Sequence, residues 1–361
     1  MAVLEIARFR LRDGVAAGEF LVQNLRVELD YISSRPGYRA GSRRTTIADD
    51  GTWVITVGWE STADAEASMA AFMDAPETKG YLDLVNLSSM SMERMTEIPA
   101  PASRKAANAR ALYLGGIRDA HVREAVTANT GDRYTQHSTG VRDGVEGFVE
   151  FFDEFVVRNP KRDIQIVRAI EDGPYVFVHA FQSINGGESQ WVTTDLFDTD
   201  GNDRIVEHWD VISAFTGPNP AGRTQVDGAT TVTDLERTEE NKARVREMIQ
   251  RVMIDGDGTA AAEYISAETY LQHNTDSGDG LEGLGAMLGQ LAERGATMTY
   301  RNVFKVIGQG NFVVAYSLMD LGGEELAVFD LFRLEGGMIV EHWDNMEPIP
   351  PANELVNSGK F

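Results

Sequence analysis

The hexapeptide Ile-Val-Glu-His-Trp-Asp occurs twice in this chain, at residues 205–210 and 339–344. If each copy is a β-strand, Val, His and Asp share one face of the sheet, and Ile, Glu and Trp share the other. A His and an Asp on one face can act on one substrate. One removes a proton next to a carbonyl, and the other donates to the developing oxyanion. The residues in question are His208, Asp210, His342 and Asp344.

Histidines are concentrated in the repeated motifs of the chain. Of the six histidines, four occupy duplicated positions: His137, His208, His273 and His342. Histidine is the side chain that exchanges protons most readily near neutral pH, with an unperturbed pKa of about 6.5. This concentration indicates a site. Duplication also copies structural histidines, so both interpretations stay open.

Several other polar residues are duplicated. Asp195 and Asp330 each precede Leu-Phe, so we expect buried carboxyls whose perturbed pKa marks either a site or a structural ion pair. His137 and His273 follow Tyr and Gln residues, and such a group can orient a substrate or tie a loop to the sheet.

Two acidic pairs have the spacing of a helix cap. Asp143 with Glu146, and Asp279 with Glu282, each precede an apolar helical run. An acid at the N-cap with Glu three residues later satisfies free helix amides. We therefore predict capping boxes here rather than paired catalytic carboxylates.

These motifs belong to two copies of one unit. Residues 134–147 (YTQHSTGVRDGVEG) align without a gap with residues 270–283 (YLQHNTDSGDGLEG), and residues 195–210 align with residues 330–344 with one deletion. Residues 217–233, rich in Gly, Pro and Asn, join the copies. Helical segments followed by long strands predict an α+β fold with a curved sheet around a helix-covered pocket.

The pattern YxQH…DGxEG followed by DLF and IVEHWD resembles the SnoaL-like branch of the nuclear transport factor 2 superfamily, and more narrowly the aldol-condensation type. The second copy fits better, since it has Pro348-Ile-Pro350 and the closing Asn357-Ser-Gly-Lys-Phe361, where the first has Phe215-Thr-Gly-Pro218. The resemblance implies two conical α+β barrels, at residues 105–218 and 234–361, paired as a pseudo-dimer. Each barrel would have one small-molecule pocket.

Characterised members of this superfamily include polyketide cyclases, ketosteroid isomerases and epoxide hydrolases. The resemblance implies that pocket His and Asp side chains act without a metal. The chain departs from the common His-Asn-Pro sequence after the glutamine, because the copies read His137-Ser-Thr and His273-Asn-Thr.

We expect residues 1–98 to form a separate domain. Alternation and helical spacing predict the ferredoxin-like order βαββαβ. The expected elements are strand 3–11, helix 15–33, strands 39–47 and 53–59, helix 62–73 and strand 88–96. With the turn Trp59-Glu60-Ser61, the domain resembles antibiotic-biosynthesis-monooxygenase-type dimeric α/β barrels, which implies a homodimer.

Two further observations concern this first block. It contains no histidine, which excludes haem ligation by His there, and Met90, Met92 and Met95 are predicted to be core or dimer interface. The segment Pro99–Ala106 is rich in Pro and Ala, and we predict that it is the linker to the repeats.

Composition excludes several classes of protein. The net charge is −23, so the surface repels phosphate and anionic lipid, and we expect no nucleic-acid or membrane partner. The absence of Cys excludes thiolate chemistry and suits a reducing compartment. Neither a signal peptide nor an apolar run of about 18 residues is evident. We expect a cytoplasmic protein.

The motifs lead to a hypothesis about function. The sequence has no P-loop, GxGxxG, GxSxG, HxH or HExxH pattern, so we expect neither cofactor nor metal. We predict an enzyme that transfers protons on a small hydrophobic or carbonyl-containing ligand, in aldol cyclisation or isomerisation. The second barrel is the better candidate. Its predicted pocket residues are His342, Asp344, Asp330 and His273, with counterparts His208, Asp210, Asp195 and His137.

Three alternatives stay open. The barrels can bind an apolar ligand without turning it over. The first domain can instead carry the activity, as a cofactor-independent monooxygenase. The third alternative is a structural, oligomer-forming protein.

Overall fold

The computed structural model describes residues 2–39, 42–96 and 103–361. The chain divides into two units, Met1–Pro101 and Ala102–Phe361. Both repeats lie in the second unit, so the division into three domains stays a prediction.

Most of the predicted linker lies outside the described residues. Its last residues form the start of helix α4 (Arg104–Ala111) instead, because the Ser103 hydroxyl accepts a hydrogen bond from the Ala106 amide and caps the helix. The linker prediction was therefore too long at this end.

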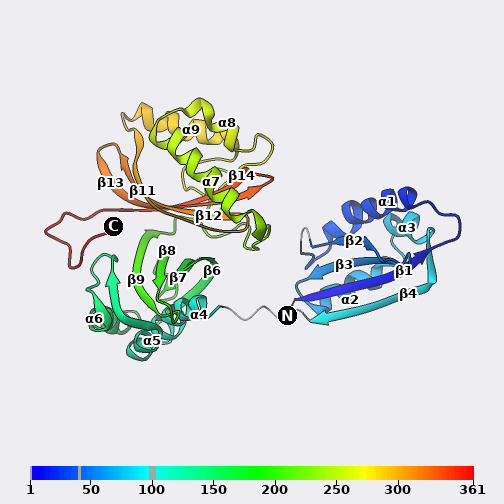
Figure 1. Cartoon of the computed structure of the whole chain (residues 1–361), viewed down its shortest axis with the longest axis horizontal. Coiled ribbons are helices and arrows are strands. Elements are labelled where there is room, and N and C mark those ends of the chain that lie inside the picture. Colours follow the sequence, from blue (N-terminus) through cyan, green and yellow to red (C-terminus); the bar gives the residue numbers. More distant parts are fainter. Residues whose placement is uncertain (1, 40–41, 97–102) are drawn as a thin grey trace. The chain divides into compact units, whose positions relative to one another are not determined.

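The first unit has the predicted ferredoxin-like plan, with an antiparallel sheet in the order β2-β3-β1-β4 (Figure 1). Alternate residues of β3, such as Trp53, Ile55 and Val57, are buried in one core with residues of α1 and α2. Its elements are β1 (Val3–Leu11), α1 (Ala17–Arg26) continued by the π-helical segment Val27–Tyr31 and the 3-10 helix Ile32–Ser34, β2 (Arg44–Ile47), β3 (Trp53–Trp59), α2 (Thr62–Phe72), the 3-10 helix Pro76–Thr78, α3 (Lys79–Leu82) and β4 (Val85–Thr96).

The methionines of β4 divide between core and surface. Met90 packs against the core of the unit, whereas Met92 and Met95 are exposed. Of these three methionines, Met90 therefore has the predicted position in the core, and Met92 and Met95 do not.

The first repeat begins the second unit. Three helices precede or interrupt its strands, and its long strands come last, as the pattern predicts. The elements are α4 with the π-helical segment Leu112–Arg118, α5 (Val122–Asn129), β5 (Thr130–Gln136), α6 (Gly144–Arg158), β6 (Arg162–Asp172), β7 (Tyr175–Ile184), β8 (Ser189–Thr199) and β9 (Ile205–Ala214).

The second repeat has the same order of strands. Its elements are the 3-10 helix Leu235–Arg237, α7 (Thr238–Met248) with the π-helical segment Ile249–Ile254, the 3-10 helix Gly258–Ala260, α8 (Ala261–Tyr264), β10 (Leu271–Gln272), α9 (Gly280–Glu293), β11 (Met298–Gln309), β12 (Phe312–Leu321), β13 (Glu324–Glu335) and β14 (Met338–Pro348). The two sheets have the matching orders β5-β9-β8-β7-β6 and β10-β14-β13-β12-β11. In each sheet the short strand β5 or β10 is parallel to its neighbour.

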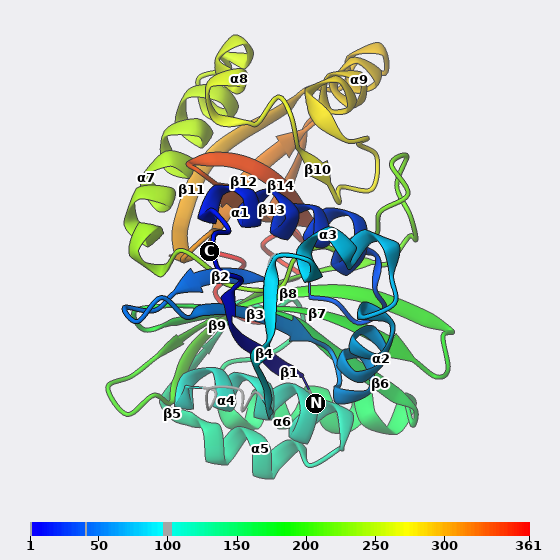
Figure 2. The same cartoon turned by 90° about the vertical axis from the view of Figure 1, so that its right-hand side faces the viewer.

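The two sheets of the second unit pack face to face. One apolar cluster contains residues of both, including Phe177 and Phe329, whose ring centroids lie 5.5 Å apart. Helices α4–α6 cover the outer face of one sheet and α7–α9 that of the other (Figures 1 and 2). Each sheet therefore has one face toward its helices and one toward the other repeat.

A register shift changes the predicted division of the hexapeptide. Thr199 pairs with Ile205 and Asp198 with Glu207, so the intervening Val206 is an extra residue in β9. Ile205 consequently lies in the helix-side cluster, as does Ile339 after the same shift in β14. The expectation that Ile shares a face with Glu and Trp was wrong.

Among the described residues, the helices are all too short or too polar to cross a membrane.

Candidate active site

Each repeat encloses a cavity between its sheet and its helices. The first cavity measures about 260 Å³ and includes the aromatic rings of Phe148, Phe152 and Trp191 in its lining. The second measures about 130 Å³ and is lined by several methionines, among them Met253 and Met319. Both cavities are mostly apolar, and each is lined by one His and by two Asp side chains at matching positions of the repeat. The second is also lined by Asp276 and Arg294.

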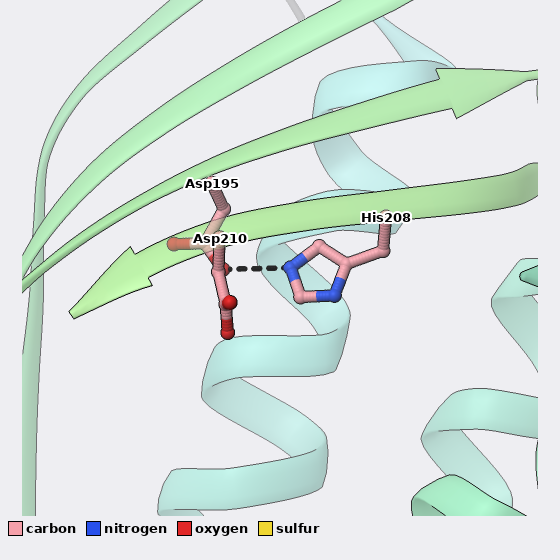
Figure 3. A group of neighbouring side chains, drawn as sticks. All are labelled: Asp195, His208 and Asp210. Carbon is pink, nitrogen blue, oxygen red and sulfur yellow. Dashed lines mark hydrogen bonds and ion pairs between the residues drawn. The ribbon is translucent and has the colours of Figure 1, made fainter. Parts of the chain in front are cut away.

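In the first cavity, Asp195 of β8 and Asp210 of β9 lie directly opposite each other in the sheet (Figure 3). His208 Nε2 lies 2.9 Å from Asp195 Oδ1, and its Nδ1 lies 2.8 Å from Gln136 Oε1. The Tyr113 hydroxyl donates to the other oxygen of Asp195. This set of side chains links the sheet to the helical segment above it.

The second cavity repeats the arrangement. Asp330 of β13 lies opposite Asp344 of β14, and His342 Nε2 lies 3.0 Å from Asp330 Oδ1. His342 Nδ1 lies 3.1 Å from Gln272 Oε1. The Tyr300 hydroxyl donates to Asp330 Oδ2 at 3.0 Å. Asp330 is fully buried, whereas Asp344 is partly exposed and lines the cavity.

The partners of His342 define its protonation. Both ring nitrogens face oxygen acceptors, so both hydrogen bonds form only if the ring carries two protons. The orientation of the Gln272 amide supports two protons on the ring of His342. Its Nε2 donates to the Tyr270 hydroxyl at 2.9 Å, so its Oε1 faces His342 as an acceptor. The hydrogen-bond geometry therefore favours the doubly protonated form of His342.

Burial and charge act in opposite directions on these groups. Burial lowers the pKa of His342, but the hydrogen bond to Asp330 and the charge of Asp344 outweigh it, and the net pKa is raised. Burial raises the pKa of Asp344 more than His342 lowers it, so that pKa is also raised. A carboxyl with a raised pKa that faces a cavity is suited to proton exchange near neutral pH.

His137 and His273 do not line the cavities, which corrects the prediction that they do. Each follows a Gln whose side chain faces the cavity, so each points to the opposite face of the sheet. There His273 stacks on Trp343 with centroids 4.6 Å apart, and its Nε2 lies 3.0 Å from Glu341 Oε1. His137 stacks on Trp209 in the same way. These two histidines belong to the interface between the sheets.

The predicted capping boxes were also wrong. Asp143 and Asp279 occupy the N-cap positions of α6 and α9, but their carboxylates accept from the Gln136 and Gln272 backbone amides at 2.7 and 2.9 Å. These bonds hold the YxQH segments against the helices. Glu146 forms an ion pair with Arg123 on the surface instead of closing a box.

Sequence reasoning missed several polar residues of the two sites. Tyr113 and Tyr300 both donate to the buried Asp, but they come from a helical segment and a strand, so the repeat does not reveal them. Asn274 Nδ2 donates to Asp344 Oδ2 at 2.6 Å. Lys360, near the end of the chain, lies 3.0 Å from Asp210. Only the fold brings these distant residues to the sites.

The three donor side chains of each site lie close enough to bridge an ion, with ligand atoms within 4.8 Å of one another. In the first site the ammonium group of Lys360 already neutralises Asp210. In the second, His342 Nε2 is turned toward Asp330 and holds a proton there, so it offers no lone pair. The donor set fits a hydrogen-bonded network better than a metal centre.

Comparison with known proteins finds similarity in solved structures only. No protein-family model and no curated protein matches the chain. SnoaB, a cofactor-independent oxygenase from Streptomyces nogalater, is 15% identical, with 28% of this chain and 98% of that chain covered and a TM-score of 0.24. IdmH, a candidate polyketide cyclase from Streptomyces antibioticus, is 15% identical, with 30% and 91% covered and a TM-score of 0.27.

Proposed function

We propose that the protein is an enzyme that transfers protons on small carbonyl compounds in its second cavity. One observation carries the proposal. Asp344 faces an apolar cavity of about 130 Å³, and burial raises the pKa of its carboxyl beside the buried pair His342–Asp330. A general base acts best when its pKa lies near the working pH.

Asp344 is the group that exchanges the proton. Its carboxylate removes a proton from the carbon next to the carbonyl, and the electron pair of the C–H bond moves onto the carbonyl oxygen. The Tyr270 hydroxyl lines the cavity, accepts from Gln272 and keeps its own proton for this oxygen. Asp344 then returns the proton to another carbon, which is isomerisation. In the aldol reaction the enolate instead attacks the carbon of a second carbonyl, and the oxygen of that carbonyl takes up the proton from Asp344.

His342 acts as a positioning residue. Both of its ring nitrogens are engaged by Gln272 and Asp330, so it does not reach the substrate directly. Its positive charge stabilises the Asp344 carboxylate and the developing enolate. This assigns the proton transfer to Asp344 rather than to the histidine.

The same proposal extends to the architecture. We propose that each repeat, at residues 105–218 and 234–361, is a SnoaL-like barrel, because both sheets share one strand order and enclose a cavity. The first unit has a cavity of about 50 Å³, smaller than the cavity enclosed by either repeat, so we assign the activity to the second unit. Homodimerisation through residues 1–98 and a cytoplasmic location remain proposals.

Hydrogen–deuterium exchange at carbon tests the function directly. Cyclohexanone and 3-cyclohexen-1-one are incubated in D2O with the full chain, and NMR follows deuterium uptake and the shift of the double bond. We expect Asp344→Asn to slow both by about 10²- to 10⁴-fold. The surface variant Asp255→Asn is the control.

Two outcomes contradict the proposal. If the wild-type chain binds these ketones without exchange, the cavity is a binding site only. If EDTA abolishes exchange, a metal takes part in the reaction.

A further inference from the structure

The end of the chain contacts the opposite repeat. The tail, residues 349–361, leaves β14 and returns to the first repeat, where Asn357 Nδ2 donates to the Ser138 backbone oxygen at 2.8 Å. His137 Nδ1 lies 2.6 Å from the Gly359 oxygen. Ser138 lines the first cavity. A segment of the second repeat is therefore hydrogen-bonded to a residue that lines the first cavity.

Lys360 of this tail is buried with two carboxylates. Its side chain is 1% exposed, and its Nζ lies 3.0 Å from Asp210 Oδ1 and 2.8 Å from Glu347 Oε2. It also donates to the Asp210 backbone oxygen at 3.2 Å. All three protons of the ammonium group are thus used. A buried ammonium group persists only with such partners, so the contact with Asp210 is a fixed part of the structure.

The second repeat receives a matching segment without a lysine. Asn219 Nδ2 donates to the Gln272 backbone oxygen at 2.7 Å, and His273 Nδ1 lies 2.7 Å from the Thr224 oxygen. Lys360 follows Gly359, whose oxygen contacts His137, and Gln225 follows Thr224, whose oxygen contacts His273. Gln225 is therefore the counterpart of Lys360. Its amide group bonds to Ser213, Ala214 and Thr216. Asp344 is therefore hydrogen-bonded to the neutral side-chain amide of Asn274, whereas Asp210 is paired with the ammonium group of Lys360.

We propose that Lys360, supplied by the tail of the second repeat, makes the two cavities chemically unequal. It is a positioning residue that holds Asp210 as a permanent acceptor for a hydroxyl-bearing ligand, while Asp344 exchanges protons. The half concerning Asp344 rests on the proposed function, and the half concerning Asp210 does not.

The groups around Asp210 support a fixed charge. Burial raises the pKa of Asp210, but Lys360 and the other partners outweigh it, and the net pKa is lowered. The pKa of Asp195, opposite it, is raised by burial, so the two carboxyls of this pair are shifted in opposite directions. The titratable and charged groups that face Asp210 are Asp195, His208, Tyr113, Tyr134, Tyr316, Glu347 and Lys360.

The groups around Asp344 leave its pKa raised instead of lowered. They are His342, Asp330, Asp276, Tyr270 and Tyr300. His342 is the one cation in this set, and it is already paired with Asp330. The same Asp position thus has a lowered pKa in the first cavity and a raised one in the second.

The lining of the first cavity defines the class of ligand. Its volume of about 260 Å³ is twice that of the second, and rings such as Phe148, Phe151 and Trp191 surround it. A permanent carboxylate accepts a hydrogen bond from a hydroxyl group and repels anions. The ligand is therefore an uncharged, mostly apolar molecule with a hydroxyl group.

Titration of the two carboxyls tests the proposal without any need for turnover. The full chain is labelled with 13C at the Asp carboxyls, and Asp210→Asn and Asp344→Asn assign the two signals. We expect the wild-type Asp344 signal to titrate at higher pH than that of Asp210. Lys360→Met moves the Asp210 midpoint upward and leaves the Asp344 midpoint in place. An unchanged Asp210 midpoint in this variant overturns the proposal, whether or not the protein exchanges protons on ketones.

Two further variants distinguish the effect of the Lys360 charge from a general loss of structure. Lys360→Arg keeps the charge and restores the wild-type midpoint of Asp210. Glu347→Gln removes the second carboxylate from Lys360 and does not raise that midpoint. A raised midpoint in either variant contradicts the assignment of the effect to the Lys360 charge.

Binding of matched probes tests the ligand class. We expect the wild-type chain to bind 2-naphthol at least 10-fold more tightly than 2-naphthoate at pH 7 in titration calorimetry. Lys360→Met reduces this preference, and Asp344→Asn does not. Equal binding of both probes, or binding of neither, overturns the assignment of the ligand class.

Discussion

At the scale of single residues, the side chains of the repeated hexapeptide divide between the cavity and the interface of the two sheets. His342 and Asp344 enter the cavity, whereas Glu341 and Trp343 lie between the sheets. The first copy divides in the same way, with Trp209 in the same apolar cluster as Trp343. One short strand thus carries part of a candidate site on one face and part of the interface between repeats on the other.

The protonation of His342 has a consequence for stability. Folding raises the pKa of His342 above its value of 6.5 in the unfolded chain. The folded state therefore binds this proton more tightly, so the stabilisation is complete below pH 6.5 and is lost as the pH rises through the folded pKa. We expect the free energy of unfolding in urea to fall between pH 6 and pH 9.

His342→Gln flattens this pH dependence, and the surface variant His121→Gln does not. Equal slopes for His342→Gln and the wild type would show that the ring is neutral in the folded protein.

Trp343 is expected to stabilise the interface of the sheets. It is 2% exposed, stacks on His273 and lies 4.2 Å below the guanidinium group of Arg168. Trp343→Ala should lower the free energy of unfolding by about 3–5 kcal/mol, whereas Trp343→Phe retains most of the packing. Denaturant unfolding measures both. A loss below about 1 kcal/mol for Trp343→Ala would mean that the interface closes around the gap.

At the scale of elements, the short strand β10 and helix α9 are joined by one carboxylate. Asp279 accepts from the Gln272 amide and forms an ion pair with Arg223 of the segment between the repeats. The same bond in the first repeat joins Asp143 to Gln136. Because Gln272 and Gln136 hold the cavity histidines, these carboxylates position the sites from outside the cavities.

Asp279→Ala should lower the free energy of unfolding by about 1–3 kcal/mol, since a charge-assisted hydrogen bond to a backbone amide is lost. Asp279→Asn keeps an acceptor for the Gln272 amide and should lose less. Thermal and urea unfolding measure the difference. Equal losses in the two variants would assign the effect to the Arg223 ion pair instead.

At the scale of the whole molecule, the two repeats share one core and exchange their terminal segments. Phe177 of one sheet packs on Phe329 of the other, and the tail from residue 349 binds the first repeat. The repeats therefore cannot lose their structure independently without exposing a shared apolar cluster.

Calorimetry of the full chain is expected to show two transitions, one for each unit. The transition of the second unit should have equal calorimetric and van't Hoff enthalpies, because its repeats unfold together. Three separate transitions would show that the repeats are independent domains.

The sequence alone determined the local structure and the existence of the repeats. Alternation placed β1 at Val3–Leu11 and β3 at Trp53–Trp59, and the order βαββαβ follows from such local patterns. It also placed His342 and Asp344 on one face, since two residues in a strand have a fixed relation. These features depend on the spacing between residues that are close together in the chain, and this spacing can be read directly from the sequence.

Only the tertiary structure decided which side chains meet. The bulge at Val206, the turn of His273 away from the cavity and the approach of Lys360 to Asp210 all depend on contacts between distant segments. The two Asp positions follow the same five residues, Ile-Val-Glu-His-Trp, so the repeated motif alone predicts the same pKa for both. They differ because burial costs each carboxylate its hydration, and an ammonium group compensates that loss at Asp210 alone.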